Sequence, residues 1–333
     1  MKYMLLIGAA AVFASCGNNP LDVDVSSVNV EPVKIQRFDQ DFFALNAGNI
    51  SQQLPELCKK YGAFTNLFTG TIVCPQGIED SICIPEITRF VKDKDMRAAY
   101  DACLKTFGDL KPEEEKITDI FRHYSYYFPK KKLPRVFAIM SGFNYSIAAS
   151  DSVIALGLEM FLGKNYSYYE LLQYPSFKQL SMAKAYIPAS FARAWMMKEF
   201  PNTNKSETLL NEMIYQGKLF YLTDALMPEE NDTLKIGFTK KQLDWCFDHE
   251  KEMWGYLIEN KALYSTEHET IAKYTGEGPF TTGFVKESPA RTGVWIGWRI
   301  VKKYMEENRN TTLEQLMNES DAQIILAKSK YKP

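Results

Sequence analysis

Two consecutive helical patterns, joined by a polar loop, constrain the fold of this protein more than any other stretch. In residues 187–200, Ile187, Phe191 and Trp195 recur every four residues and therefore lie on one face of the first helix. The second pattern runs roughly over residues 207–225, and prolines bound both segments. We therefore expect two adjacent helices whose apolar faces lie in the core.

The hydrophobic period changes between residues 134 and 163. Three short β-branched and aromatic runs, at residues 135–140, 145–148 and 152–156, are separated by Ser, Gly, Asn and Asp turn signals. A further alternating run at residues 33–37 predicts another strand. The expected fold class is α+β, mostly helical with a small antiparallel sheet arranged as a meander.

The C-terminal third of the sequence predicts more helices. One starts at the capping residue Thr239 and continues through Trp254 and Ile258. A long helix is expected to start at Ser288-Pro289 and reach about Asn308, and a short one follows over residues 313–326.

Two glycines inside the long helix predict a close helix–helix contact. Gly293 and Gly297 stand four residues apart, although each glycine costs up to about 1 kcal/mol against alanine in a helix. We expect another helix to approach this face, so that a larger side chain at Gly297 overpacks the contact.

The N-terminus has the pattern of a bacterial lipoprotein signal peptide. Lys2 precedes an apolar run over residues 4–13, and Phe13-Ala14-Ser15-Cys16 resembles a lipobox. We expect Cys16 to be acylated and to anchor the protein to a membrane. The alternative is an ordinary secretory peptide with an incidental cysteine.

These patterns divide the sequence into residues 1–16 as signal peptide and lipobox, residues 17–30 as a flexible tether, and residues 31–333 as one globular domain. The start of the mature segment, residues 17–20, has no acidic residue of the kind that some bacterial lipoproteins carry as a surface-export signal. We therefore expect the domain to lie in the cell envelope and to face the periplasm.

Charge and motifs exclude several function classes. With 39 Lys and Arg against 41 Asp and Glu, and no basic half, the sequence does not predict a nucleic-acid partner. Neither a nucleophile elbow nor a phosphate-binding glycine loop is present. We expect no catalytic residue, no metal and no cofactor.

The helix pair resembles the place where zinc peptidases hold their metal, but zinc ligands are missing there. The window from Ser190 to Ala194 contains no His, and Gln216 stands where the second helix would supply a Glu. Arg193 and Gln216, together with Arg291, instead form a candidate partner-binding cleft for an acidic or amide group.

Several motifs together resemble a known family. They are the lipobox and the segments at residues 35–43, 157–163, 215–228 and 287–301. The sequence is similar along nearly its whole length to the gliding-motility lipoproteins of the GldB family of Bacteroidetes. The resemblance implies a cell-envelope lipoprotein associated with gliding and the type IX secretion machinery. It also implies a distant, zincin-like similarity to predicted zinc-dependent peptidases.

The function expected from these observations is non-catalytic binding of an envelope protein partner. Two other classes stay open. A hydrolase could use His249 and Glu250 with a distant ligand, although these residues also fit a charged helix face. A glycan-binding lipoprotein could use Trp295, Trp298 and the tyrosines of residues 166–174.

Overall fold

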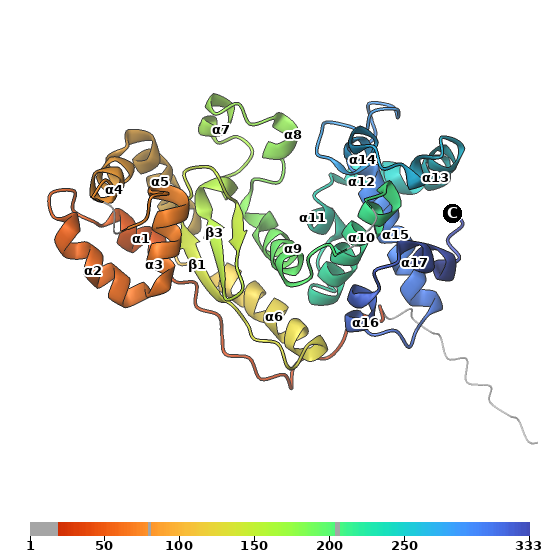
Figure 1. Ribbon diagram of the computed structural model, residues 1–333, viewed down its shortest axis with the longest axis horizontal. Helices are drawn as coiled ribbons and strands as arrows, with labels where there is room; N and C mark the ends of the chain where they lie inside the picture. The colour runs from red at the N-terminus through yellow and green to blue at the C-terminus, as the bar shows by residue number, and fades with distance from the viewer. Residues whose placement is uncertain (1–18, 79–80, 204–206) are drawn as a thin grey trace, which may run out of the picture.

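A computed structural model describes residues 19–78, 81–203 and 207–333. The predicted signal peptide and Cys16 lie outside the described residues. The protein is 59% helical and has one three-stranded sheet, which confirms the α+β class (Figure 1). The helices before the sheet are α1 Phe38–Phe43, α2 Ile50–Tyr61, α3 Ala63–Phe68, α4 Cys83–Lys92, α5 Lys94–Phe107 and α6 Lys111–Tyr127.

The helices after the sheet form the rest of the molecule. They are α7 Ser167–Leu171, α8 Ser176–Gln179, α9 Ile187–Glu199, α10 Leu209–Leu226, α11 Asp232–Ile236, α12 Lys240–Asp248, α13 Glu250–Glu259, α14 His268–Thr275, α15 Thr292–Glu307, α16 Leu313–Asn318 and α17 Ala322–Ser329. Figure 1 shows α1–α5 on one side of the sheet, α6 and α9 on the other, and α10–α17 beyond them.

The sheet is mixed, so the expected antiparallel meander is wrong. Its order is β1 (Arg135–Ile139), β3 (Val153–Gly157), β2 (Ile147–Ala149). β3 pairs in parallel with β1 and antiparallel with β2. All of β3 is buried, whereas β2 is half-buried at the edge. A strand of continuous apolar residues is typical of a central position in a sheet. β3 therefore lies between β1 and β2, although it follows both of them in the sequence.

The strand expected at residues 33–37 is reduced to a single bridge. Gln36 alone pairs with Phe137 of β1, through backbone hydrogen bonds of 2.9 Å to Val136 and Ala138. The residues that follow it form α1.

A buried carboxylate fixes the connection between β1 and β2. The Glu159 side chain is fully buried, and its Oε1 accepts hydrogen bonds from Ser141 Oγ at 2.7 Å and from the Phe143 amide at 3.1 Å. The Ser141 amide donates to the same oxygen. Because three donors meet one carboxyl oxygen, the loop after β1 is fixed against Glu159, which lies just after β3.

Glu159 should make the stability of the protein depend on pH. Burial raises the pKa of its carboxyl above the ordinary 4.5, even though the Ser141 and Phe143 donors lower it. Between pH 4.5 and the folded pKa, the folded state therefore keeps a proton that the unfolded state releases. The contribution of this group to the free energy of unfolding is fully present below pH 4.5 and is lost as pH rises through the folded pKa. In Glu159→Gln this loss should be absent. Urea unfolding at a series of pH values checks it, and parallel profiles for the two proteins would contradict it.

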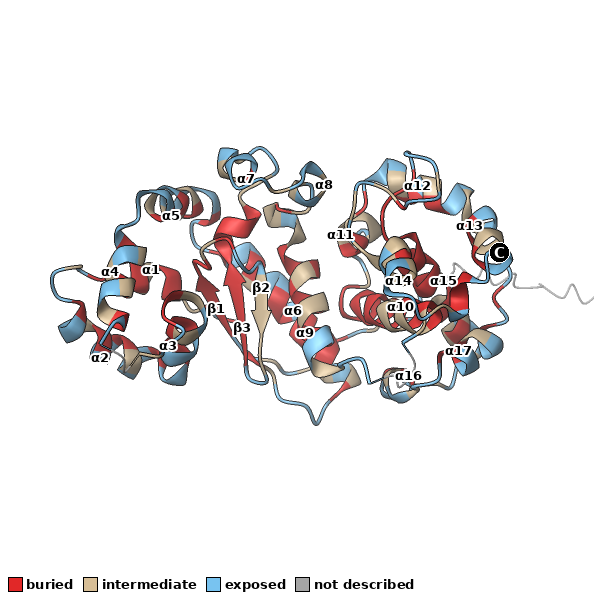
Figure 2. Ribbon diagram, turned by 45° about the horizontal axis from the view of Figure 1, so that its top comes forward, coloured by how far each residue is buried: buried red, intermediate tan, exposed pale blue. Residues whose placement is uncertain are grey.

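The predicted helix pair is confirmed as α9 and α10. Ile187, Phe191 and Trp195 of α9 are buried. Buried residues occur around most of the circumference of α10, and Figure 2 shows α10 and α15 largely buried. A helix that is buried on nearly all sides lies at the centre of a core.

α10 and α15 meet backbone to backbone through two glycines. A Cβ atom added at Gly297 would lie 1.8 Å from the Met213 carbonyl oxygen, and one at Gly217 would lie 2.3 Å from the Gly297 carbonyl oxygen. The close contact expected at Gly297 is therefore confirmed, with Gly217 as the partner on α10, whereas Gly293 faces Tyr274 of α14.

Three helix boundaries differ from the sequence-based expectation. The helix expected to run from Thr239 to Ile258 breaks at His249, whose φ of −115° and ψ of 18° are not helical. The long C-terminal helix starts at Thr292 because Arg291 has a left-handed backbone, with φ 59°. The last helix is divided into α16 and α17.

Residues 19–30 contain no helix or strand, yet they lie against the domain. Leu21 and Val25 are buried, and the Tyr127 hydroxyl of α6 donates a hydrogen bond of 3.3 Å to the Leu21 carbonyl. In Figure 1 this segment runs from the neighbourhood of α16 along α6 to the sheet. The division into tether and single domain stays a prediction.

Candidate functional site

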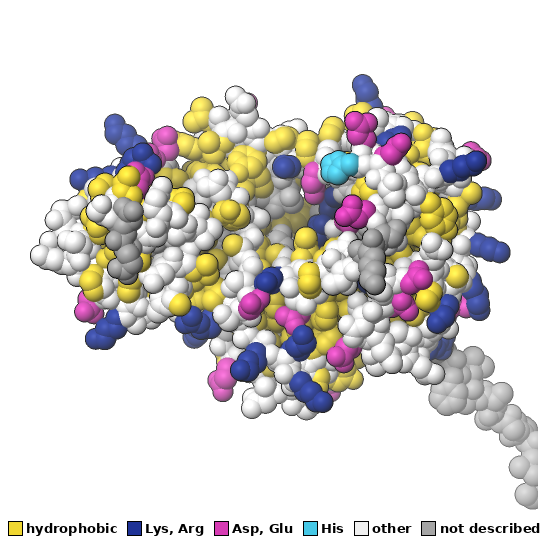
Figure 3. All heavy atoms as spheres, viewed as in Figure 1, with side chains coloured by type: hydrophobic (Ala, Val, Ile, Leu, Met, Phe, Trp, Pro, Cys, Tyr) yellow, Lys and Arg dark blue, Asp and Glu magenta, His cyan; other side chains and the backbone are white. Residues whose placement is uncertain are grey.

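A small polar pocket lies between α8, α9, α11 and the loop before α15. Its volume is about 120 Å³. Arg193 and Arg291 line it together with Ser190, and Phe177 and Leu180 are among its apolar residues. Figure 3 shows this face hollowed between the side that carries α8 and the side that carries α12, with Lys or Arg atoms in the hollow.

Arg193 is a partly buried guanidinium without an ion pair among the described residues. Its Nη2 donates a hydrogen bond of 3.1 Å to Gln216 Oε1, and its Cζ lies 4.8 Å from the centre of the Phe220 ring. Its Nε is buried and has no hydrogen-bond partner. Burial and the nearby charge of Arg291 lower the pKa of Arg193 to about 10, so it stays cationic at neutral pH.

Gln216 connects Arg193 indirectly to a carboxylate. Its Nε2 donates a hydrogen bond of 2.8 Å to Glu212 Oε1, one turn earlier on α10. This bond fixes the amide so that its oxygen faces Arg193. Gln216 thus orients the guanidinium but leaves its charge uncompensated.

Arg291 is held by a strained backbone and by two partners. Its Nη2 donates a hydrogen bond of 2.7 Å to the Ile236 carbonyl, and its Nε lies 3.4 Å from Glu277 Oε1. Burial lowers its pKa, and Glu277 acts against this shift. A left-handed conformation costs a non-glycine residue about 1–2 kcal/mol, and such strain clusters at binding sites.

The structure brings the three predicted cleft residues together. Arg193 and Gln216 are hydrogen-bonded, and Arg291 lines the same pocket as Arg193. Sequence reasoning missed Glu277 and Lys235, which also line the pocket. Neither residue lies in a motif, so no sequence signal could have identified them.

The zinc-peptidase window does not provide a metal site. Phe191 and Ala192 are buried in the core, whereas Ser190 and Arg193 line the pocket. Within residues 19–78, 81–203 and 207–333, no three His, Cys, Asp or Glu side chains gather where a metal ion could be held. One hydroxyl and a guanidinium do not fit zinc, which needs about three N, S or O ligands. The distant zincin similarity stays a prediction.

His249 and Glu250 have structural contacts at the junction between α12 and α13. His249 Nδ1 lies 2.9 Å from the Trp245 carbonyl oxygen, and its ring stacks on Trp245. Glu250 Oε1 accepts hydrogen bonds of 2.9 Å from Arg299 and 2.8 Å from the Tyr331 hydroxyl. Both groups therefore have structural partners around the α12–α13 break.

Of the aromatic residues considered for glycan binding, Trp295, Trp298 and Tyr169 lie in the core, whereas Tyr166, Tyr168 and Tyr174 are half-buried. Trp295 and Trp298 are 0% and 1% exposed, so they present no face to a sugar. In the tyrosine cluster, Tyr169 is buried and its hydroxyl donates a hydrogen bond of 2.6 Å to the Glu159 carbonyl.

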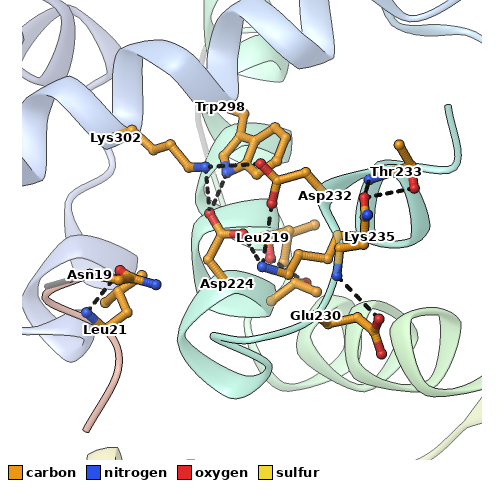
Figure 4. A network of polar contacts seen from close by, with 12 residues as sticks. Asn19, Leu21, Leu219, Asp224, Glu230, Asp232, Thr233, Lys235, Trp298 and Lys302 are labelled. Atoms are coloured by element: carbon orange, nitrogen blue, oxygen red, sulfur yellow. Dashed lines mark hydrogen bonds and ion pairs between the residues drawn. The ribbon is translucent and has the colours of Figure 1, made fainter. Parts of the chain in front are cut away.

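A second polar cluster stabilises the interface of α10, α11 and α15 (Figure 4). Asp224 is buried and accepts hydrogen bonds of 2.7 Å from Trp298 Nε1 and 3.1 Å from Lys235 Nζ. Lys302 Nζ lies 3.1 Å from the same carboxylate, and Asp232 pairs with both lysines. Since every charge is balanced inside the cluster, it is a structural network.

The fold and the pocket define a helical α+β protein with an arginine-lined polar pocket. The chain belongs to the family of the gliding motility protein GldB, whose family model matches residues 18–333. No curated protein and no solved structure matches it. Among the described residues, no helix has the length and apolar character needed to cross a membrane.

Proposed function

We propose that this protein is a non-catalytic, lipid-anchored envelope component of gliding motility and the type IX secretion machinery. It acts by binding an acidic group of an envelope protein partner in the pocket of Arg193, Gln216 and Arg291. Membership of the GldB family supports the association with gliding. The proposed lipid anchor rests on the lipobox, and the proposed partner binding rests on the pocket.

The observation that carries the binding role is the unpaired Arg193. The Nε atom of Arg193 is buried without a hydrogen-bond partner, and desolvating part of a charged group is costly unless a partner compensates for it. Arg193 has an amide oxygen and a ring as neighbours but no carboxylate contact among the residues described. A partner's acidic group would supply the missing contact.

Site-specific photo-crosslinking in cells tests this role. A photoreactive amino acid at Leu180, which lines the pocket and is 37% exposed, should crosslink a defined envelope protein. The matched control is Leu104 on α5, which is 36% exposed and does not line the pocket. Adding Arg193→Gln should abolish the crosslink at position 180.

A crosslink at position 180 that persists in Arg193→Gln, or an equal one at position 104, would count against the pocket as the binding site. Zinc analysis addresses the hydrolase alternative. We expect well below one equivalent of zinc in the purified protein and no change of melting temperature with chelator. Stoichiometric zinc lost together with stability would favour a peptidase.

Lipidation gives a separate prediction. Cys16→Ser should move the protein from the membrane fraction to the soluble fraction, because the thiol that receives the acyl group is removed. Fractionation followed by immunoblotting checks this. Cys58→Ser is the matched control and should stay with the membrane. Exported wild-type protein that is already soluble would refute the anchor.

The periplasmic orientation is tested on intact cells. An externally added protease should leave the domain uncut, whereas it should degrade the domain after the outer membrane is permeabilised. Degradation before permeabilisation would place the domain on the cell surface.

A further inference from the structure

The size of the arginine-lined pocket limits what can enter it. Its volume of about 120 Å³ corresponds to roughly four water molecules, at about 30 Å³ each. Pockets for drug-sized ligands start at about 300 Å³. The pocket therefore admits one small group, and the remainder of a ligand must lie across its rim.

The charged residues that line the pocket favour a ligand group with one negative charge. Lys235 is paired with Asp224 and Asp232, and Arg291 with Glu277. Only Arg193, of the three lining cations, has no carboxylate partner among the described residues. One negative charge balances this excess, whereas a phosphate dianion exceeds it.

The rim is apolar on the side of α8. Phe177 and Leu180 line it there, Tyr186 follows before α9, and the Phe238 ring lies 5.3 Å from Arg291 Cζ. The segment before α8 exposes Leu171 and Leu172, at 69% and 45%. A free inorganic anion would gain nothing from these side chains, whereas a polypeptide segment can contact them.

We infer that the pocket holds a carboxylate of a polypeptide. Arg193 is the main partner of this carboxylate, and Arg291 lies beside it. The apolar side chains at the α8 rim contact the residue of the polypeptide next to the carboxylate. The planar guanidinium fork matches a carboxylate in two parallel hydrogen bonds. This inference rests on the proposed function and names the chemistry of the partner. The carboxylate has two possible sources, the C-terminus of a polypeptide or an Asp or Glu side chain.

Fluorescence anisotropy with three labelled peptides tests the inference, using the full-length protein in detergent. The first peptide, Gly-Ser-Gly-Ser-Ala-Leu, has a free C-terminal carboxylate. The second is its C-terminal amide, and the third is an amide in which Asp replaces Ala. We expect at least one of the two carboxylate peptides, the first or the third, to bind at least about tenfold more tightly than the second, as for a charged hydrogen bond.

Variants assign the binding to the pocket. Arg193→Gln should weaken the tighter-binding carboxylate peptide at least about tenfold, and Arg193→Lys should restore part of the affinity because it keeps the charge but loses the fork. Arg89→Gln on α4, where the side chain is 78% exposed, is the matched control and should change nothing. Leu180→Asp on the exposed rim gives a second test if Arg193→Gln does not fold, since its carboxylate should also weaken binding.

The relative affinities of the three peptides distinguish the two possible sources of the carboxylate. Equal binding of the first and third peptides supports a carboxylate from either source, and binding of the third alone assigns it to a side chain. Binding of inorganic phosphate without any carboxylate peptide, or no binding at all, would overturn the inference. A crosslink at position 180 that depends on Arg193 would then still support the proposed function.

Discussion

Gly297→Ala should lower the free energy of unfolding by about 3 kcal/mol or more, at the upper end of overpacking substitutions. One methyl group suffices, because the new Cβ would lie 1.8 Å from the Met213 carbonyl oxygen, and a backbone atom cannot rotate away as a side-chain atom could. α10 and α15 would have to separate. A gap of about 1 Å already forfeits a quarter to a half of the dispersion energy across a contact.

Gly255→Ala in α13 is the matched control. A Cβ there meets no atom within 4 Å, so the same chemical change should stabilise the protein by up to about 1 kcal/mol. Urea unfolding followed by circular dichroism measures both variants. A Gly297→Ala protein as stable as wild type would show that the two backbones do not meet as described.

Asp224→Ala should cost about 3–5 kcal/mol, because it removes one partner from a buried ionic cluster. Lys235 is 4% exposed and would retain only Asp232, at 3.4 Å. Trp298 Nε1 would lose its acceptor, and Lys302 its closer carboxylate. Unfolding by urea at neutral pH measures the loss.

Asp244→Ala is the control for this variant. Asp244 forms an exposed pair of 2.7 Å with Lys240 in the same helix, so its loss should cost no more than about 0.5 kcal/mol. If Asp224→Ala costs as little as Asp244→Ala, then Lys235 and Lys302 find other partners or water. The network would then contribute little to stability.

The helices could be predicted where local signals repeat. Ile187, Phe191 and Trp195 recur every four residues, and prolines bound the helix pair. The break at His249 could not be predicted, because no Gly or Pro marks it. Likewise the parallel pairing of β1 with β3 joins residues 18 positions apart, such as Arg135 and Val153, and no local pattern marks this pairing.

The candidate pocket could be predicted only in part. Arg193 and Gln216 occupy positions where a zinc-peptidase resemblance directs attention, and the structure places them in hydrogen-bond contact. The pairing of Arg291 with Glu277 could not be predicted, because it depends on the path of the loop between α14 and α15. The positive φ of Arg291 has no sequence signal, since glycine is the usual marker of that conformation.

The attachment of residues 19–30 to the domain limits how far the protein can reach. Leu21 is buried, so only the four residues from 17 to 20 could separate the domain from Cys16 if that residue is acylated as we propose. Four residues span at most about 14 Å. A domain anchored in this way would stay at the bilayer surface and would meet partners by two-dimensional diffusion, at a high effective concentration. A long Gly/Ser insertion between Asn18 and Asn19 that leaves gliding intact would show that this proximity is dispensable.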